Sequence, residues 1–367
     1  MTANTITNSK KPEAMYDVLK SWVDRFLSDE EAVLLGVLLV ASFTVIIWMG
    51  GILAPFLTGI VLAFVMQGII NALLNSGVPS GLSIAATFLV FLGGFVTTLF
   101  LVIPRVWRQL QRLFDELPSM ALRTQEILAD LPTRYPRFVS QSQVDTWSAM
   151  LNAEVGDIGQ WLVSFSLSQL PLIVTVGVYM MLVPILVFFF LKDKDLILSW
   201  CVAYLPEKRP LMNRIFSEMN QQMANYVRGK VIEIIVVGLV TYAFFTYFGL
   251  EYAALLAFLL GLSVIVPYVG VIAVSVPVVI IAYLQFGISD ELMYLLIGHT
   301  IIQLLDGFVL VPMLFSEAVN LHPIAIIGAV LVFGSWWGLW GVFFAIPLAT
   351  LVKSIVNAWP RANAEVG

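Results

Sequence analysis

The chain has 367 residues, of which 60% are hydrophobic and only 12% are charged, and its mean hydropathy is +0.93. Soluble proteins carry about 25% charged residues, so this composition predicts an integral membrane protein and argues strongly against a soluble enzyme or a nucleic-acid-binding protein. The formal net charge of −5 arises from 19 basic and 24 acidic residues that nearly cancel, so it says little about partners.

The residue types that carry most enzyme chemistry are scarce. Cys201 is the single cysteine and His299 and His322 are the two histidines, which rules out an internal disulfide and predicts no metal site. The Gly-Lys pair at Gly229 lacks the glycine and hydroxyl residues of a phosphate-binding loop. Asp306 has no second aspartate in its span with which to form a catalytic dyad. We therefore predict no enzyme activity and no cofactor.

Apolar stretches predict an all-α, polytopic fold of about 7–8 transmembrane helices. The N-terminus is polar and contains no cleavable signal sequence, so the first apolar span must direct insertion. Residues 32–74 contain no charge and are long enough for two spans that turn near Gly50, Gly51 and Pro55. Single spans are predicted in the stretches 81–103, 170–191, 231–248 and 292–315.

Two stretches in the C-terminal half are interrupted. Residues 253–285 contain IVPYVG, in which Pro267, Tyr268 and Gly270 predict a helical hairpin or a broken helix. Transporters use such breaks to present backbone groups to substrate, and a larger residue at Gly270 would then block passage. A tight turn between two short spans is the alternative.

Further break candidates follow. Residues 324–352 contain GSWWGLWG and predict either a second broken hairpin or one overlong, tilted helix. Gly338 and Gly341 would then mark a break or a close contact between helices. Pro312 is a break candidate at the end of the preceding span.

Basic residues predict the orientation, because Lys and Arg are retained in cytoplasmic loops. The N-terminal segment 1–31 and the loop 192–230 are both basic and are predicted to be cytoplasmic, in agreement with the even number of predicted spans between them. The segment 104–169 should then lie outside, despite its six arginines, because long segments obey the charge rule weakly. The basic residues used are Lys10, Lys11, Lys20, Arg25, Lys192, Lys194, Lys208, Arg209, Arg214, Arg228 and Lys230.

The external segment 104–169 is predicted to be a helical extension between the first three spans (32–103) and a transporter core (170–357), which a tail (358–367) follows. Apolar residues recur at helical spacing after residue 104, and a coiled-coil-like seam precedes the fourth span. Residues 15–27 and 212–227 are also amphipathic and predict helices along the cytoplasmic interface or ordinary helix packing. The seam residues are Val144, Trp147, Leu151, Val155, Ile158, Leu162 and Phe165.

The most informative polar residues are His299, Gln303 and Asp306, whose spacing of i, i+4 and i+7 places them on one helix face. A charge such as Asp306 within a span faces a bundle interior or an aqueous cavity and predicts an ion or proton role. The alternative is that Asp306 and Gln303 form interhelical hydrogen bonds. His299 could relay protons or donate to a backbone carbonyl as a packed residue.

Glu233 lies at the cytoplasmic end of its span, one turn after Arg228 and Lys230. It is either a second ion-coupling candidate or, as we favour here, an interfacial carboxylate paired with those cations, whose long side chains normally reach the membrane surface.

These residues fall within motifs that resemble the autoinducer-2 exporter family, also known as PerM-like permeases. In order they are FFFLKDKD, LPEKR, NYVRGKVIE, FGLEYA, IVPYVG, QLLDGFVLVP, NLHP and GLWGVFFAIPLATLVKSI, with ILAPFLTGIVLAFV matching more loosely near the N-terminus. The resemblance implies a multi-pass protein of the bacterial inner membrane that forms homo-oligomers. It also implies one of the activities attributed to the family, which are signal-molecule export and sodium/proton antiport.

We therefore predict an inner-membrane secondary transporter that exports a small solute, such as the signalling molecule autoinducer-2. A sodium(lithium)/proton antiporter that uses Asp306 is one alternative, and a membrane scaffold without transport is another. The predicted partners are the lipid bilayer, a small-molecule or cation substrate and further copies of the chain, but no nucleic acid.

Overall fold

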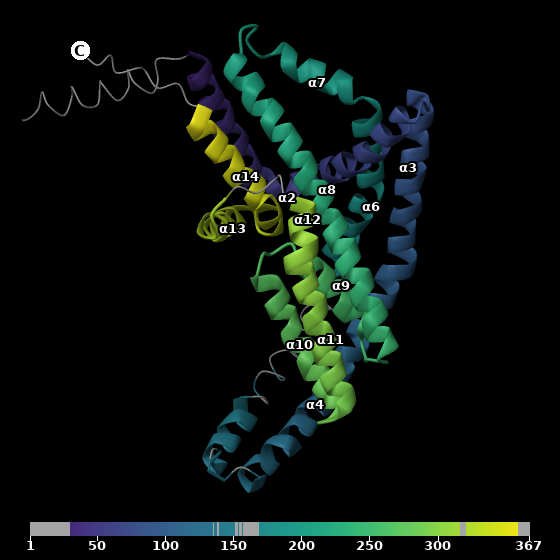
Figure 1. The fold of residues 1–367 in the computed structure, drawn as a ribbon, viewed down its shortest axis with the longest axis vertical. Helices are drawn as coiled ribbons and strands as arrows, with labels where there is room; N and C mark the ends of the chain where they lie inside the picture. The colour runs from purple at the N-terminus through teal and green to yellow at the C-terminus, as the bar shows by residue number, and fades with distance from the viewer. Residues whose placement is uncertain are drawn as a thin grey trace, which may run out of the picture. The chain divides into compact units, whose positions relative to one another are not determined.

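The computed structural model describes residues 30–134, 136–137, 139–150, 153, 156, 169–315 and 321–358, and every regular element in these ranges is a helix (Figure 1). The predicted helix at 15–27, most of the seam from 144 to 165 and nearly all of the tail 358–367 lie outside the described residues. The chain divides into two compact units, of which unit 1 comprises 1–54, 195–223 and 319–367, and unit 2 comprises 55–194 and 224–318.

Seven helical stretches of the described chain are long and apolar enough to cross a membrane. This number confirms the predicted all-α, multi-spanning fold. The stretches are Glu30–Asn75, Ser80–Thr133, Thr175–Lys192, Pro210–Tyr247, Val269–Phe286, Asp290–Phe315 and Leu339–Ala358.

The first helix, α2 (Glu30–Asn75), has 46 residues and continues through Gly50, Gly51 and Pro55 without a turn. The predicted turn at these residues is therefore wrong. A proline inside a helix removes one hydrogen bond and bends the helix, and no polar turn residues follow it here to end the helix. The boundary between the two units nevertheless falls directly before Pro55.

The unbroken α2 also changes the topology argument. Three helical stretches, not four predicted spans, precede Lys192, so parity no longer places the N-terminal segment and the loop 192–230 on the same side. Helix α6 (Gln169–Lys192) contains one of the stretches long enough to cross a membrane, and the placement of residues 104–134 and Lys192 on opposite sides stays a prediction.

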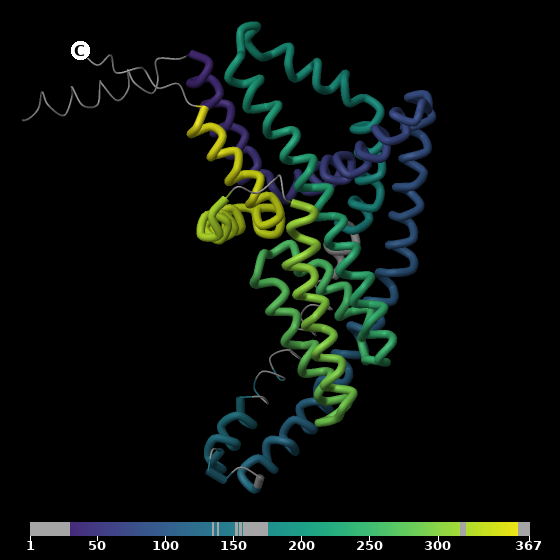
Figure 2. The backbone as a smooth tube through the Cα atoms, viewed as in Figure 1, coloured from purple at the N-terminus to yellow at the C-terminus, as the bar shows by residue number. Residues whose placement is uncertain are grey.

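The third predicted span continues directly into the extension. Helix α3 (Ser80–Thr97), the π-helix η1 (Thr98–Val102) and α4 (Ile103–Arg134) form one continuous path in Figure 2. Pro104 follows η1, and the wider π-turn accommodates a proline that has no amide hydrogen to donate. The predicted amphipathic helix after residue 104 is confirmed, since Val106 is buried whereas Arg108 is exposed.

Helices α9 to α11 form the main core of unit 2 together with the second part of α8 and part of α4. They are α8 (Pro210–Tyr247), α9 (Ala253–Ser263), α10 (Val269–Phe286) and α11 (Asp290–Leu305). Their buried side chains include Phe245, Leu256, Leu260, Val278 and Leu295. A second cluster joins the end of α2 to α3 and α6 through Ala63, Phe91 and Val187.

The cytoplasmic loop predicted at 192–230 is largely helical. Helix α7 (Lys194–Ala203) precedes α8, and α8 continues from Pro210 to Tyr247 without interruption. The amphipathic stretch 212–227 is therefore the first part of a helix of 38 residues, not a separate helix from the span 231–248.

The interrupted stretch 253–285 is a helical hairpin, as predicted. Helices α9 and α10 pack against each other, and Gln285 at the end of α10 ties together the hairpin base. Its amide nitrogen donates to the Gly249 carbonyl at 2.9 Å, and its amide oxygen accepts from the Glu251 nitrogen at 2.8 Å. Helix α10 has 18 residues and is long enough to cross a membrane, whereas α9 has 11.

The extension contacts the start of this hairpin. Tyr252 precedes α9 with a positive φ of 57° and provides no side-chain cap, and Gln109 of α4 accepts a hydrogen bond from the Leu255 nitrogen at 2.8 Å instead. The Tyr252 hydroxyl donates to Glu116 at 2.7 Å. Burial, and then the Glu116 carboxylate, raise the pKa of Tyr252, so the phenol stays protonated and donates at neutral pH.

We expect Gln109→Ala to destabilise the protein by about 1 kcal/mol, the usual cost of removing a helix N-cap, because the Leu255 amide loses its acceptor. Thermal unfolding in detergent checks this value, with Gln111→Ala on the exposed face of α4 as the matched control. Equal stability of the two variants would show that Gln109 does not cap α9.

Unit 1 contains the second interrupted stretch. Helices α13 (Pro323–Trp337) and α14 (Leu339–Ala358) meet at Gly338, whose φ of 58° favours glycine. The predicted alternative of a second broken hairpin is therefore confirmed, because the two helices also pack against each other. A Cβ atom at Gly341 would lie within 1.8 Å of the Phe333 carbonyl oxygen, so Gly341 permits close packing of the two helices.

The two sides of the membrane can be distinguished with one native and one introduced thiol. Cys201 of α7 is exposed, and Ser140 of the extension is exposed as well. Helix α6 lies between the extension and Lys192. An impermeant maleimide should therefore label Ser140→Cys, in a Cys201→Ser background, in intact cells. In the unmodified protein it should label Cys201 only after the cells are permeabilised. Labelling of both sites from the same side would contradict this topology.

Candidate functional site

Small residues bring the tip of the hairpin close to α8. A Cβ atom at Gly261 of α9 would lie 2.9 Å from the Ile234 carbonyl and 3.1 Å from the Gly238 Cα atom. Such contacts between small residues allow helix backbones to approach closely in membranes. The tip therefore lies beside the part of α8 that begins at Lys230.

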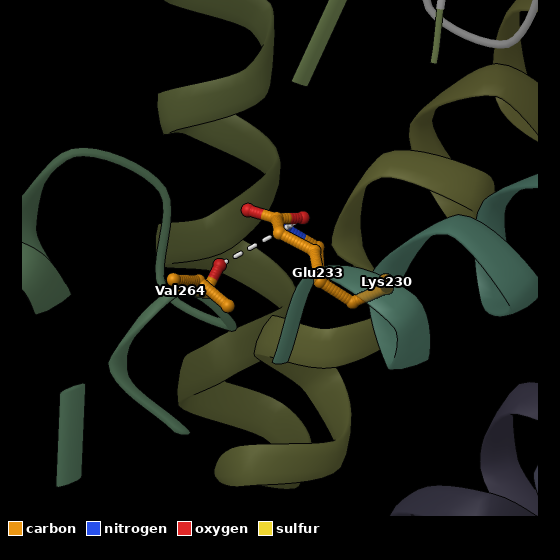
Figure 3. A network of polar contacts seen from close by, with 3 residues as sticks. All are labelled: Lys230, Glu233 and Val264. Atoms are coloured by element: carbon orange, nitrogen blue, oxygen red, sulfur yellow. Dashed lines mark hydrogen bonds and ion pairs between the residues drawn. The ribbon is translucent and has the colours of Figure 1, made fainter. Parts of the chain in front are cut away.

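Lys230 is buried and reaches the tip of the hairpin (Figure 3). Its Nζ atom lies 2.7 Å from the Glu233 Oε2 atom and donates to the Val264 carbonyl at 3.0 Å. The same ammonium lies 5.2 Å from the ring centroid of Phe315, a cation–π contact. Lys230 thus connects α8, the hairpin and α12 (Val311–Phe315).

Asp306 is the third member of this site, which we call the buried charge cluster: Lys230, Glu233 and Asp306. Their exposed fractions are 5%, 2% and 8%. Asp306 interacts electrostatically with both Lys230 and Glu233, and its Oδ1 atom has no hydrogen-bond partner among the described residues. Measured along the helices, the cluster lies about 24 Å from the start of α11 at Asp290, within the depth of a bilayer.

A π-helix positions Asp306. Helix η2 (Asp306–Leu310) has its Val311 nitrogen bonded to the Asp306 carbonyl, five residues earlier. Pro312 has no amide hydrogen, so it donates no hydrogen bond to the preceding turn of the helix. π-Helical turns of this kind occur frequently at functional sites. The predicted break at Pro312 is therefore a change of helix type, and the chain remains helical.

The other two candidates on this span face the protein as well. His299 is buried, and its Nε2 atom lies 3.0 Å from the Ser275 hydroxyl, which donates to the Val271 carbonyl at 2.8 Å. Because that hydroxyl has one hydrogen, we infer that Nε2 donates and Nδ1 is unprotonated. The expectation of a backbone carbonyl partner for His299 is wrong, since the partner is a hydroxyl. Both amide atoms of Gln303 are buried without partners among the described residues.

The hairpin tip has unusual backbone geometry. Tyr268 has φ 63° and ψ −52°, and the Val269 nitrogen bonds to the Pro267 carbonyl at 2.7 Å, which together define a γ-turn. A non-glycine residue in this conformation costs about 1–3 kcal/mol and is retained where surrounding contacts determine it. Tyr268 itself is exposed.

Gly270 packs closely against helix α9. It is buried, and a Cβ atom there would lie 1.9 Å from the Ser263 carbonyl oxygen, so α10 packs directly on the α9 backbone. A larger residue at Gly270 would therefore separate the two helices and would not act as a plug.

The structure supports one part of the favoured interpretation of Glu233. Its pairing with Lys230 is present, but both side chains are buried within the protein, so the expectation that the lysine reaches out to the surface is wrong. The interfacial location of Glu233 stays a prediction. Lys230 was not among the predicted site residues. The sequence did contain a signal for Lys230: a cation three residues before a carboxylate on an apolar helix can form an ion pair. Such pairing lowers the cost of burying both charges. Gly338 and Gly341 belong to unit 1, whereas the residues of this site belong to unit 2.

The charge of the cluster determines its chemistry. With all three groups ionised, two carboxylates and one ammonium give a net charge of −1. Burial of an uncompensated charge is costly, so one bound proton or monovalent cation would stabilise the cluster. Carboxylate, carbonyl and amide oxygens are hard ligands of the kind that alkali and other hard cations prefer.

Membrane-spanning helices that bury ionisable groups and break at a hairpin define a multi-pass membrane protein with the features of a transporter. The comparisons with known proteins identify its family. The sequence profile described as AI-2E family transporter matches residues 37–361, and the chain belongs to this family.

Its relatives include transport proteins of bacteria and archaea. The chain is 43% identical over 346 residues to a protein of Escherichia coli strain K12 that carries the name permease PerM, covering 94% of this chain and 98% of that protein. It is 28% identical over 325 residues to a Bacillus subtilis protein named as the transport protein YueF, covering 84% of each chain. A Methanocaldococcus jannaschii protein named as a transport protein is 26% identical over 187 residues, covering 51% of this chain and 55% of the relative. The protein is accordingly a membrane transport protein.

Proposed function

We propose that this protein is a secondary transporter whose cycle is coupled to one proton or monovalent cation bound at the buried charge cluster. The observation that carries this proposal is the burial of Lys230, Glu233 and Asp306 between helices long enough to cross a membrane. Intramembrane ionisable residues are expensive to bury and are typical of ion and proton pathways.

Coupling follows from competition for one site. A proton and a sodium or lithium ion each bring the cluster from a net charge of −1 to neutrality, so binding of one opposes binding of the other. A site that is alternately open to the two membrane faces then exchanges one ion for the other. A coupled solute would cross with one of these two forms.

The cargo we propose is a small solute that the protein exports. The family is described as AI-2E transporters, so a signalling molecule such as autoinducer-2 is the first solute to test. In the alternative of a sodium(lithium)/proton antiporter the cation itself is the cargo, and the charge cluster favours this second candidate specifically.

The cellular setting is also part of the proposal. We place the protein in the bacterial inner membrane, with the basic residues of 192–230 in the cytoplasm, following the positive-inside rule. We further propose that copies of the chain associate in the bilayer as a homo-oligomer, as membership of the family suggests.

Flux in proteoliposomes tests the proposal. A pH-sensitive dye inside the vesicles should report proton movement when sodium or lithium is added outside, and radiolabelled autoinducer-2 should show counterflow if it is the cargo. Cation-driven proton flux without solute movement would identify an antiporter. Absence of both fluxes in vesicles that contain folded protein would indicate a scaffold and overturn the proposal.

A further inference from the structure

We propose that Lys230 is the positioning residue that transmits the occupancy of the buried charge cluster to the tip of the hairpin. The inference rests on the proposed function, because it assigns to Lys230 the step between ion binding and the movement of backbone. It is carried by the contacts that Lys230 makes with Glu233 of its own helix and with Val264 of the hairpin, both drawn in Figure 3, and by its contact with Phe315 of α12.

The ammonium group of Lys230 joins two elements. It has three hydrogens, and it contacts the Glu233 carboxylate at 2.7 Å and the Val264 carbonyl at 3.0 Å. Val264 directly follows α9, so the hydrogen bond attaches the hairpin tip to α8 across 34 residues of sequence. Among the described side chains, Lys230 is the one for which a hydrogen bond to this carbonyl is found.

The attraction between Lys230 and the two carboxylates is electrostatic. While Glu233 and Asp306 are ionised, they attract the ammonium and hold it beside the tip. A proton or a monovalent cation on these carboxylates cancels part of that attraction, and a bound metal cation also repels the ammonium directly. Lys230 then shifts, and its hydrogen bond to Val264 changes.

The base and the tip of the hairpin are held by different contacts. The base is fixed by Gln285, and the α9 start is held by Gln109. The tip contains the γ-turn at Tyr268, a conformation retained only while neighbouring contacts maintain it. Release of the Lys230 contact therefore removes one of the contacts that maintain the strained turn at the tip.

Close packing transmits this change along the hairpin. Gly270 holds α10 against the Ser263 backbone, so the two helix ends at the tip move together. The hairpin tip is thus the two-state element that the charge cluster would bias, as a coupling mechanism requires.

The experiment uses a thiol at the tip of the full-length protein. Tyr268→Cys in a Cys201→Ser background places a reporter on an exposed side chain of the turn. The rate of maleimide labelling is measured in purified protein in detergent. One series compares sodium, lithium and a large inert cation at a single pH. A second series varies the pH in the inert cation, with each rate corrected for the fraction of thiolate at that pH. We expect sodium, lithium or protons to change the rate severalfold in this parent.

The test variant is Lys230→Met, which retains a long side chain without the charge. We expect its labelling rate to be the same under all these conditions. Lys230→Met/Glu233→Gln should behave identically and avoids a buried, unpaired carboxylate, which protects the test if the single variant does not fold. Lys194→Met, at an exposed lysine of α7, should respond as the parent does.

Two results would overturn the inference. One is a parent reporter that does not respond to any of these ions, and the other is a foldable Lys230 variant that still responds as the parent does. Either result leaves the proposed function standing if proteoliposomes show cation-driven flux. Loss of that flux in the unmodified protein would instead refute the proposed function itself.

Discussion

Asp306→Asn should abolish the dependence of transport on the proton gradient while leaving the protein folded. The amide keeps the shape of the side chain but cannot ionise, so the cluster retains one carboxylate and one ammonium and no longer needs a cation for neutrality. Proteoliposome flux measured with and without an imposed pH gradient checks this result. We expect the stimulation by the gradient to fall by at least about tenfold, which corresponds to about 1.4 kcal/mol of lost coupling.

Two controls separate coupling from packing. Asp290→Asn changes an exposed aspartate at the start of the same helix and should retain the response of the parent. Asp306→Leu removes the carboxylate entirely, leaves Lys230 less compensated and should lower stability. A structural role for Asp306 predicts a different pattern, in which Asp306→Asn transports and responds to pH as the parent does while Asp306→Leu is destabilised.

Gly270→Ala should be the most destabilising single-methyl change in the hairpin. The added Cβ atom would lie 1.9 Å from the Ser263 carbonyl oxygen and 2.8 Å from its carbonyl carbon, which are backbone atoms that cannot rotate away. Overpacking commonly costs about 1–3 kcal/mol, and we expect about 3 kcal/mol or more here, because α9 and α10 must separate. The midpoint of thermal unfolding in detergent measures the loss.

Gly177→Ala provides the matched control for this substitution. Gly177 lies within α6, and a Cβ atom there meets no atom within 4 Å. Since alanine favours helix more than glycine, this change should be neutral or slightly stabilising. A Gly270→Ala protein that unfolds at the same temperature as the parent would mean that the hairpin helices are not in the close contact described.

The sequence was most informative where the bilayer imposes a strong constraint. Apolar runs predicted the spans. Glycine and proline residues within these runs predicted the hairpin turn at Pro267 and the break at Gly338. The same residue types gave a wrong prediction of a turn at Gly50, Gly51 and Pro55. A helix in an apolar run continues through such residues unless polar turn residues follow.

The candidate site was predicted in part. Its two carboxylates were found from the cost of charge within a span, and Asp306 and Glu233 both prove to be buried. Lys230 was missed because long cations near the end of an apolar stretch usually extend to the surface. The structure shows instead that it donates to Val264, 34 residues away, a contact that no local pattern encodes.

Proton release on cation binding tests the central claim most directly. Sodium or lithium is added to purified protein in weakly buffered detergent solution, and the released protons are titrated with a pH-sensitive dye. Competition for the buried charge cluster predicts release of up to about one proton per chain, with an apparent cation affinity that rises up to about tenfold per pH unit while the cluster is protonated. Asp306→Asn should remove this release. Cation binding without proton release, or with an affinity that does not depend on pH, would contradict a shared site for the two ions.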